Sequence, residues 1–364
     1  MKLIERFNSR VNDYLGYRDV SKSGRLNYIP FKYHFPRLSE YLRGIIRGTY
    51  YLITAGSGVG KSKLARYIFI TIPSQYAEVN KHIKLKIIYF AIEESAEEIL
   101  DYLISQQLWL KYRIRIAPER LSLWDNLEDD VIEKIKSCYK FFEDLDLDIV
   151  DNISNPFGMY KYCRDVSNQL GTHHFTEENG VKVYKGYEFH NKDTYAIAIF
   201  DHYALVSPEK GQNLHQAIGH LSSEYMRKQM TKHWGWICVG IQQQESAGEN
   251  VEHYKAGRLE PTLSKLGNNK ETQRDALVVL GLYAPDRYSL DMHNNYPLSI
   301  LRDTYRSMHI LKNRKGTPNK TVPLFFDGMV EVFEEMPLHE DKERLNQYYK
   351  KAKTLYNNPN TKTL

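Results

Sequence analysis

One stretch constrains the fold of this chain more than any other: residues 50–62, with the sequence YYLITAGSGVGKS. Residues 50–54 form an apolar, β-branched and aromatic run, which predicts a buried strand. Lys61 and Ser62 then open a segment with apolar residues at helical spacing, namely Leu64, Ala65, Ile68 and Phe69. A strand, a glycine-rich loop, Lys-Ser and a helix in this order form the phosphate-binding P-loop pattern.

The loop has anion-binding chemistry because its backbone N–H groups and the helix N-terminus point at one place. Lys61 would reach the β- and γ-phosphates of ATP, and the Ser62 hydroxyl would bind Mg²⁺. The first loop position holds Ala55 in place of glycine, which is tolerable if φ there stays negative. The alternative is a glycine-rich turn that binds no nucleotide. The predicted nucleotide-binding residues are Ala55, Gly56, Ser57, Gly58, Val59, Gly60, Lys61 and Ser62.

Composition places the chain among ordinary folded proteins, with 42% hydrophobic and 26% charged residues in a length of 364. The net charge of +5 is too small to imply nucleic-acid binding by itself. Cys138, Cys163 and Cys238 form no C-x-x-C pair, which favours a reducing cytosol over a disulfide framework or structural zinc. No apolar run approaches membrane-spanning length, and no secretory signal opens the chain. We therefore expect a cytoplasmic protein without a membrane partner.

Strand-like and helical patterns alternate over most of the chain, which predicts an α/β fold with a mostly parallel central sheet flanked by helices. The core domain is expected over residues 29–336, with a β-hairpin insertion at about 172–194. Residues 1–28 are expected to form an amphipathic helix and a linker, and residues 337–364 a polar helical tail with a disordered end. The helix has an apolar stripe that must be buried on its own domain or on a neighbouring subunit: Leu3, Ile4, Phe7, Val11 and Leu15.

The predicted hairpin contains His173, His174 and His190. A metal site is conceivable there, but the segment lacks the cysteine or carboxylate spacing of known sites, which argues against one.

Three predicted strands end in side chains suited to phosphate chemistry, Glu93, Asp201 and Gln242. Ligands bind at the carboxyl ends of parallel strands, so these side chains are expected near the P-loop. Splitting ATP needs a carboxylate that orients water, a carboxylate in the Mg²⁺ shell and a group that senses the γ-phosphate. We assign these roles to Glu93, Asp201 and Gln242 in that order, with Glu94 as an open alternative to Glu93. Each residue could instead be a helix cap or a solvated strand end.

The order of these motifs resembles the DnaB-like replicative helicases, which have a RecA-type ATPase core. The matching segments are FAIEES, AIFDHYALV, VGIQQQ, LSKLGNNKETQRDALVVLGLY and MHILKNRKGTPNKTVPLFFD. The resemblance spans residues 36–334, with the 172–194 hairpin as an apparent insertion. In AIFDHYALV, His202 stands between Asp201 and the aromatic residue that follows the aspartate directly in the family.

The resemblance implies a homohexameric ring that hydrolyses ATP with Mg²⁺, translocates on single-stranded DNA and unwinds duplex at a replication fork. Lys312 and Arg314 match the pair that reaches the nucleotide of the neighbouring subunit. The DNA-binding loop lacks the arginine and glutamate expected beside its glycine, and its candidate residues are Lys265, Gly267, Asn268, Asn269 and Lys270. The N-terminal helix matches the family's linker helix by position. The short stretch before the core implies a phage or plasmid protein that lacks the N-terminal domain and works with a separate primase or loader.

Two other functions would share the P-loop and the sheet. A RecA- or RadA-type recombination ATPase would form filaments or rings without unwinding, and a helicase loader or DNA-binding accessory protein would use ATP as a switch. A catalytic Glu93 together with a trans-acting Arg314 favours a motor that turns over. The role of the hairpin is open at this stage.

Overall fold

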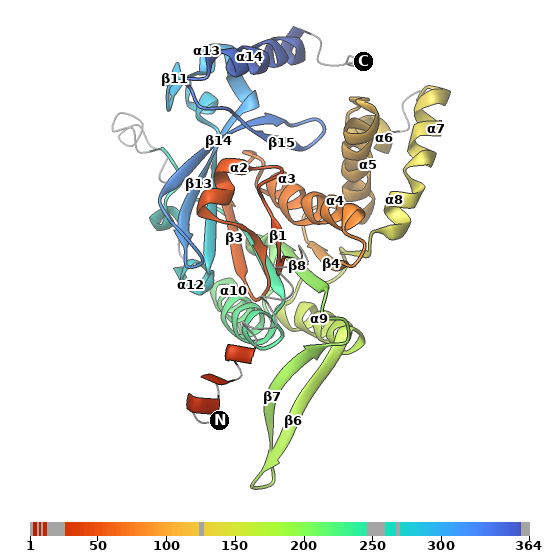
Figure 1. Cartoon of the computed structure of the whole chain (residues 1–364), viewed down its shortest axis with the longest axis vertical. Helices are drawn as coiled ribbons and strands as arrows, with labels where there is room; N and C mark the ends of the chain where they lie inside the picture. The colour runs from red at the N-terminus through yellow and green to blue at the C-terminus, as the bar shows by residue number, and fades with distance from the viewer. Residues whose placement is uncertain are drawn as a thin grey trace.

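A computed structural model describes residues 3–5, 7–8, 10–12, 26–123, 127–245, 259–266 and 270–357. Its centre is a nine-stranded sheet with the order β15-β14-β13-β10-β3-β9-β8-β4-β5 (Figure 1). The six strands from β10 to β5 run parallel, and β13, β14 and β15 extend the sheet in antiparallel fashion. The strands are β3 (Tyr50–Ala55), β4 (Lys84–Ala91), β5 (Leu147–Val150), β8 (Thr194–Asp201), β9 (Ile237–Gln243), β10 (Val278–Tyr283), β13 (Tyr305–Asn313), β14 (Lys320–Asp327) and β15 (Val332–Glu335).

Helices cover both faces of this sheet, because alternate residues of each strand point to opposite faces. Tyr51 and Ile53 of β3 face a core formed with the helical run that follows the P-loop, whereas Tyr50 and Leu52 face a second core on the other side. The first face carries α2 (Pro36–Tyr41), α3 (Lys61–Arg66), η1 (Tyr67–Thr71), α4 (Ile72–Val79) and α5 (Ala96–Tyr112). The second face carries α9 (Pro156–Leu170), α10 (Leu214–His220) and η3 (Leu221–His233). The predicted α/β fold, with a mostly parallel sheet between helical layers, is confirmed.

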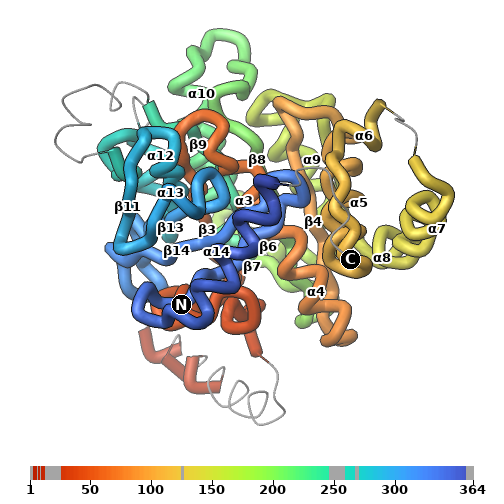
Figure 2. Tube along the Cα trace, turned by 90° about the horizontal axis from the view of Figure 1, so that it is seen from above, coloured from red at the N-terminus to blue at the C-terminus, as the bar shows by residue number. Residues whose placement is uncertain are grey.

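Shorter elements complete the body of the molecule. Figure 2 shows a group of helices beyond the β4–β5 edge of the sheet, where they pack around a small core of their own. This group adds α6 (Pro118–Ser122), α7 (Asp129–Ser137) and α8 (Tyr139–Asp144) to α5. Two short strand pairs that the sequence pattern did not predict are β1 (Tyr28–Pro30) with β2 (Gly44–Ile46), and β11 (Met292–His293) with β12 (Tyr296–Pro297).

The predicted hairpin is present and projects from the body of the molecule (Figure 1). Its strands are β6 (Gly171–Glu178) and β7 (Val181–Phe189), joined through Asn179 and Gly180, which both have positive φ. Two consecutive residues with positive φ are typical of the tight turns that match the twist of a hairpin.

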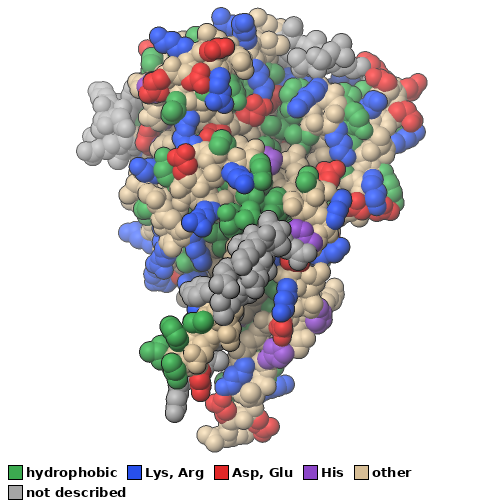
Figure 3. All heavy atoms as spheres, in the orientation of Figure 1, with side chains coloured by type: hydrophobic (Ala, Val, Ile, Leu, Met, Phe, Trp, Pro, Cys, Tyr) green, Lys and Arg blue, Asp and Glu red, His purple; other side chains and the backbone are tan. Residues whose placement is uncertain are grey.

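The two ends of the chain differ in how they pack. Leu3, Ile4 and Phe7 lie in a helical segment and are 60–85% exposed. Figure 3 shows hydrophobic side chains gathered at the lower left, in the region where Figure 1 draws the N-terminal segment. Within the described residues this apolar stripe is therefore not buried on its own domain, and Leu15 lies outside them. The predicted tail helix, α14 (Lys342–Asn357), packs on the core through Leu345 and Ala352. None of the described helices is both long and apolar enough to cross a membrane.

Candidate nucleotide-binding site

The P-loop joins β3 to α3 at the carboxyl edge of the sheet. Ala55 is the last residue of β3 and pairs with Gln243 and Leu282, so its backbone is extended and alanine fits. Gly60 precedes the first helical residue with φ of 107°, a conformation that favours glycine. Lys61 opens α3 and is only 8% exposed, so its cationic side chain is largely shielded from solvent. The local geometry is that of an anion cradle with one buried cation.

Asp201 lies at the end of β8 in the same carboxyl edge and is buried. Its Oδ2 accepts a hydrogen bond from the Tyr89 hydroxyl of β4, whereas its buried Oδ1 has no hydrogen-bond partner among the described residues. A buried carboxylate oxygen without a donor is costly unless a cation or water completes it. This oxygen suits Mg²⁺, which prefers oxygen ligands, and the Ser62 hydroxyl in the first turn of α3 is the second ligand that the sequence predicts.

Glu93 and Glu94 follow β4 but have different surroundings. Glu93 is about half exposed, and its Oε2 lies 3.3 Å from Nε2 of His202. Nδ1 of His202 accepts from the Ala204 N–H, so Nε2 carries the proton and donates toward Glu93. Burial, and then the charge of Lys61, lower the pKa of His202, which favours the neutral form of the ring beside Glu93.

Glu94 is instead tied to the buried Arg66 of α3, with 2.6 Å between its Oε2 and Nη1. Arg66 also pairs with the buried Glu331 at 2.7 Å. Glu94 thus belongs to a buried ion-pair network, whereas Glu93 faces the edge where the P-loop lies.

Gln242, near the end of β9, has both ends of its side-chain amide bonded. Its Nε2 donates to the Leu266 carbonyl at 2.8 Å, and its Oε1 accepts from the Thr272 hydroxyl at 2.5 Å. Leu266 ends η5 (Leu263–Leu266), and Thr272 lies in α12 (Lys270–Asp275). Gln242 therefore connects the strand next to β3 with both flanks of the predicted DNA loop.

The described part of that loop places its two lysines differently. Lys265 is half-buried, and its Nζ donates to the Glu260 carbonyl at 3.0 Å, whereas Lys270 is exposed. Gly267, Asn268 and Asn269 lie outside the described residues.

Lys312 and Arg314 lie at the opposite end of the sheet from the P-loop of the same chain. Val278 of β10 pairs with Asn313 of β13 on one side and with Tyr51, near the start of β3, on the other. The P-loop begins only after Ala55, four residues further along β3, or roughly 13 Å at the usual rise per strand residue. Lys312 and Arg314 are thus not brought together with the other predicted site residues within one chain.

Several residues beside the P-loop escaped the sequence prediction. Arg287 donates to the Ser57 carbonyl, and Arg306 donates through Nε to the Val59 carbonyl at 3.0 Å. Arg306 is 6% exposed, and burial lowers its pKa to about 10. The contact of Tyr89 with Asp201 could not be predicted, because a tyrosine inside an apolar strand is indistinguishable in sequence from a core residue. Of these residues, only His202 was visible in the sequence, because it interrupts the aspartate–aromatic pair of the family pattern.

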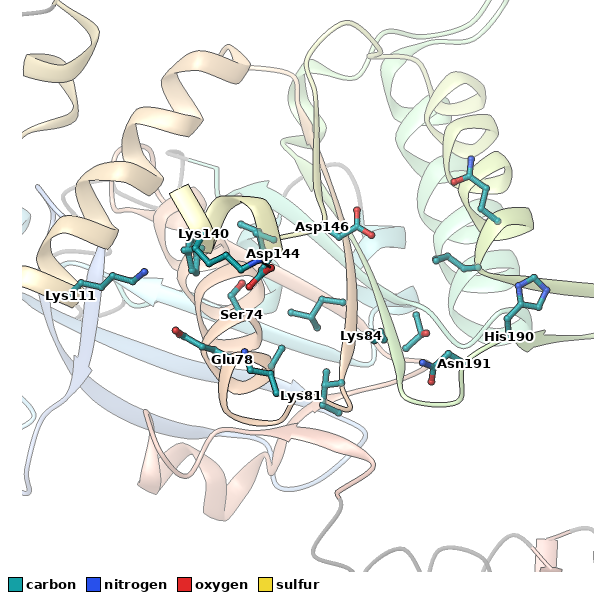
Figure 4. A pocket seen from close by; sticks show the side chains of 18 residues that line it. Ser74, Glu78, Lys81, Lys84, Lys111, Lys140, Asp144, Asp146, His190 and Asn191 are labelled. Atoms are coloured by element: carbon teal, nitrogen blue, oxygen red, sulfur yellow. Dashed lines mark ion pairs between the residues drawn. The ribbon is translucent and has the colours of Figure 1, made fainter. Parts of the chain in front are cut away.

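A separate pocket of about 760 Å³ lies far from these residues (Figure 4). Its lining includes Lys84 and Thr194, which pair at the amino ends of β4 and β8, at the opposite end of these strands from Asp201. The pocket contains none of the predicted site residues.

Comparison with solved structures identifies the fold. A DnaB-like replicative helicase, described with its interactions with primase, matches with a TM-score of 0.63 at 16% identity, over 92% of this chain and 71% of that one. This chain has the fold of a DnaB-like helicase core. The chain also superposes on a solved helicase ATPase domain with a TM-score of 0.65 at 16% identity, over 90% of this chain and 99% of that one. No protein-family model and no curated protein sequence matches the chain. The likeness to the DnaB-like core establishes the fold.

Proposed function

We propose that this chain is the subunit of a ring-shaped, ATP-driven motor that translocates on single-stranded DNA and unwinds duplex. The observation that carries the proposal is the placement of Lys312 and Arg314 at the far end of the sheet from their own P-loop. Two such cations can act on a nucleotide only if another subunit presents its P-loop to them. Head-to-tail contacts of this kind close into a ring or continue as a filament.

The charges around Arg314 support this role. Arg314 is exposed, and burial together with repulsion from Arg314 lowers the pKa of Lys312 to about 8. Asp275 acts against this lowering of the Lys312 pKa, and Arg227 adds a smaller lowering. A cluster of cations that repel one another is stabilised by an incoming anion, and the triphosphate of a neighbouring subunit is such an anion.

Within one subunit, each residue of the carboxyl edge has a separate task. The P-loop N–H groups and Lys61 would bind the phosphates, and Ser62 and Asp201 would hold Mg²⁺, which neutralises charge on the phosphates. Glu93 would accept the proton of the attacking water, with His202 holding its carboxylate in place. Glu94 would not accept this proton, because its carboxylate is paired with Arg66.

Gln242 would couple hydrolysis to DNA movement. Its amide contacts Leu266 and Thr272 on the two flanks of the DNA loop, so a change at the nucleotide edge reaches the loop through hydrogen bonds. Coupling requires an element with two positions, and both ATP and DNA must favour one position over the other. The exposed Leu3, Ile4 and Phe7 would be buried on the next subunit, as a linker helix.

The experiment that tests the proposal measures strand separation on a forked DNA, together with ATP hydrolysis with and without single-stranded DNA. We expect DNA-stimulated hydrolysis and ATP-dependent strand separation, both lost in Lys61→Ala. DNA-stimulated hydrolysis without strand separation would favour the recombination-type ATPase. Nucleotide binding with negligible turnover, with or without DNA, would favour an ATP-switched accessory protein.

A further inference from the structure

Three side chains outside the nucleotide site converge on one point between β13, the β11–β12 pair and the segment that leads into η5. They are Glu260, His293 and His309, and one ligand atom of each lies within 4.8 Å of the others. Nε2 of His293 is 2.9 Å from Oε1 of Glu260, and Nδ1 of His309 is 3.8 Å from Oε2. Both histidines are 8% exposed, whereas Glu260 is half exposed.

The second nitrogen of each histidine ring already has a protein partner. Nδ1 of His293 lies 3.1 Å from the Tyr305 hydroxyl, and Nε2 of His309 lies 2.9 Å from Oγ of Ser307. These two contacts fix the orientation of each ring, so that Nε2 of His293 and Nδ1 of His309 are directed toward Glu260. Metal-ligating histidines almost always have an outer hydrogen bond of this kind.

Bond lengths of about 2.0–2.2 Å to nitrogen and oxygen place neighbouring ligands of a tetrahedral site roughly 3.3 Å apart. The ligand atoms of the three residues lie within 4.8 Å of one another, so small side-chain rotations would bring them to that spacing. Glu260 presents a different carboxylate oxygen to each histidine, Oε1 to Nε2 of His293 at 2.9 Å and Oε2 to Nδ1 of His309 at 3.8 Å. A hydrogen bond accounts for the first separation, but the second is too long for one. The Thr321 hydroxyl, 3.3 Å from Nδ1 of His309, is the other polar group at this nitrogen.

We propose that Glu260, His293 and His309 bind a divalent transition-metal ion, with Zn²⁺ as the expected occupant. Two imidazoles and one carboxylate suit Zn²⁺ better than Mg²⁺ or Ca²⁺, which prefer all-oxygen ligands. The fourth position is left to water or to Thr321. A pocket of about 480 Å³ lined in part by His309 and Thr321 opens beside the cluster, and with the exposed side of Glu260 it offers an entry path.

The metal would link the segment before η5, which contains Glu260, to the antiparallel strand β13, which contains His309. Glu260 is linked to that loop because its carbonyl accepts from Nζ of Lys265. Metal binding would therefore order the segment that carries Lys265, a consequence that depends on the proposed function. The metal site itself does not depend on it.

The test is a titration of the full chain, freed of any histidine tag and of nucleotide, with Co²⁺ and then Zn²⁺ in excess Mg²⁺. Excess Mg²⁺ saturates oxygen sites such as Asp201 without competing for imidazole. We expect one Co²⁺ per chain, with the strong visible absorption of a four-coordinate nitrogen–oxygen site, and its displacement by one Zn²⁺. Glu260→Gln and His309→Gln should each weaken Co²⁺ affinity about 100-fold or more, beyond the roughly 10–100-fold effect of outer-contact changes.

A matched control uses the exposed His174–Glu188 pair of the hairpin, 3.7 Å apart, where Glu188→Gln should leave Co²⁺ binding unchanged. Thermal unfolding without metal shows whether each variant is folded, and Ser307→Ala is a milder variant that should weaken Co²⁺ binding about 10-fold. Wild-type protein that binds no Co²⁺ or Zn²⁺ in excess Mg²⁺ would overturn the proposal. Binding that survives unchanged in folded Glu260→Gln and His309→Gln protein would overturn it equally. Loss of helicase activity alone bears only on the proposed function, because metal stoichiometry is measured without ATP or DNA.

Discussion

At the scale of single residues, two adjacent carboxylates have opposite environments. Burial raises the pKa of Glu94, and the neighbouring Arg66 acts against that shift. Removing Glu94 would deprive the buried Arg66 of one of its ion-pair partners, so we expect Glu94 to contribute mainly to the stability of the fold. Glu93 is more exposed and lies beside the neutral His202, which leaves part of its carboxylate open to water.

We predict that Glu93→Gln lowers the ATP hydrolysis rate by about 100-fold or more while ATP still binds, because an amide cannot accept a proton. Single-turnover hydrolysis and nucleotide binding by fluorescence would measure the two effects. The comparison variant is Glu94→Gln, which should retain most activity and lose about 1–2 kcal/mol of unfolding free energy, since Arg66 keeps Glu331. If Glu94→Gln alone abolishes turnover, the assignment is reversed.

Tyr89 provides a second test at this scale. Its hydroxyl donates to Oδ2 of Asp201, which orients the carboxylate and leaves Oδ1 for a cation. Tyr89→Phe should raise the Mg²⁺ concentration for half-maximal hydrolysis about 10-fold, with a smaller change at saturating Mg²⁺. A titration of ATPase activity against Mg²⁺ measures this shift. Tyr51→Phe removes a hydroxyl on the same face of the sheet, bonded to the Gly44 carbonyl, and serves as the control. An identical Mg²⁺ dependence in wild type and Tyr89→Phe would contradict the role of this contact.

At the scale of elements, the central strands could be predicted because burial on both faces leaves an unmistakable pattern. Strands such as β3, β8 and β9 are mostly apolar runs, and parallel pairing brings their carboxyl ends to one edge of the sheet. There β3 leads into the P-loop, whereas β8 and β9 end in polar side chains. This regularity was enough to predict Lys61, Asp201 and Gln242 at the carboxyl edge, where the structure places them. The hairpin was also predictable, because alternation and an Asn-Gly turn are local signals.

Other features could not be predicted because they arise from contacts between distant segments. Glu260, His293 and His309 come together only through the β11–β12 pair and the antiparallel strand β13. The difference between Glu93 and Glu94 depends on Arg66, whose charge is buried in a helix after the P-loop. The short strand pairs were missed because two or three residues carry too little periodicity to distinguish a strand from a loop.

The loop that begins with η5 yields a prediction at this scale. If Lys265 and Lys270 contact a phosphate backbone, affinity for single-stranded DNA should fall steeply with salt and depend little on base sequence. Replacing both with alanine should reduce the slope of log affinity against log salt by about 1.4, because each phosphate contact contributes about 0.7. Fluorescence anisotropy with labelled oligonucleotides at several salt concentrations measures this slope. The control is Lys136→Ala with Lys140→Ala on α7 and α8, where both lysines pair with nearby glutamates. A slope that is unchanged in the loop variant would exclude these lysines from the DNA interface.

At the scale of the whole molecule, the two groups of residues that we propose to form one catalytic site lie at opposite ends of the sheet of a single chain. The P-loop follows the carboxyl end of β3, and Arg314 lies beyond the end of β13, level with the start of β3. Association of identical subunits would join one group to the other, and each boundary would then hold a complete site. The exposed apolar face of the N-terminal segment provides a second surface for such association.

Mixing two inactive variants tests this arrangement. Arg314→Ala should retain nucleotide binding and lose about 1,000-fold or more in turnover, as expected for a trans-acting arginine. Lys61→Ala should lose both binding and turnover but keep an intact Arg314. In rings assembled from equal amounts of the two, about one boundary in four joins an intact P-loop to an intact arginine, so ATP hydrolysis should reappear. The control is a mixture of Lys61→Ala with the double variant Lys61→Ala/Arg314→Ala, which has no intact boundary. If labelled subunits exchange and hydrolysis does not return, Arg314 acts within its own chain or only in folding, and the ring loses its main support.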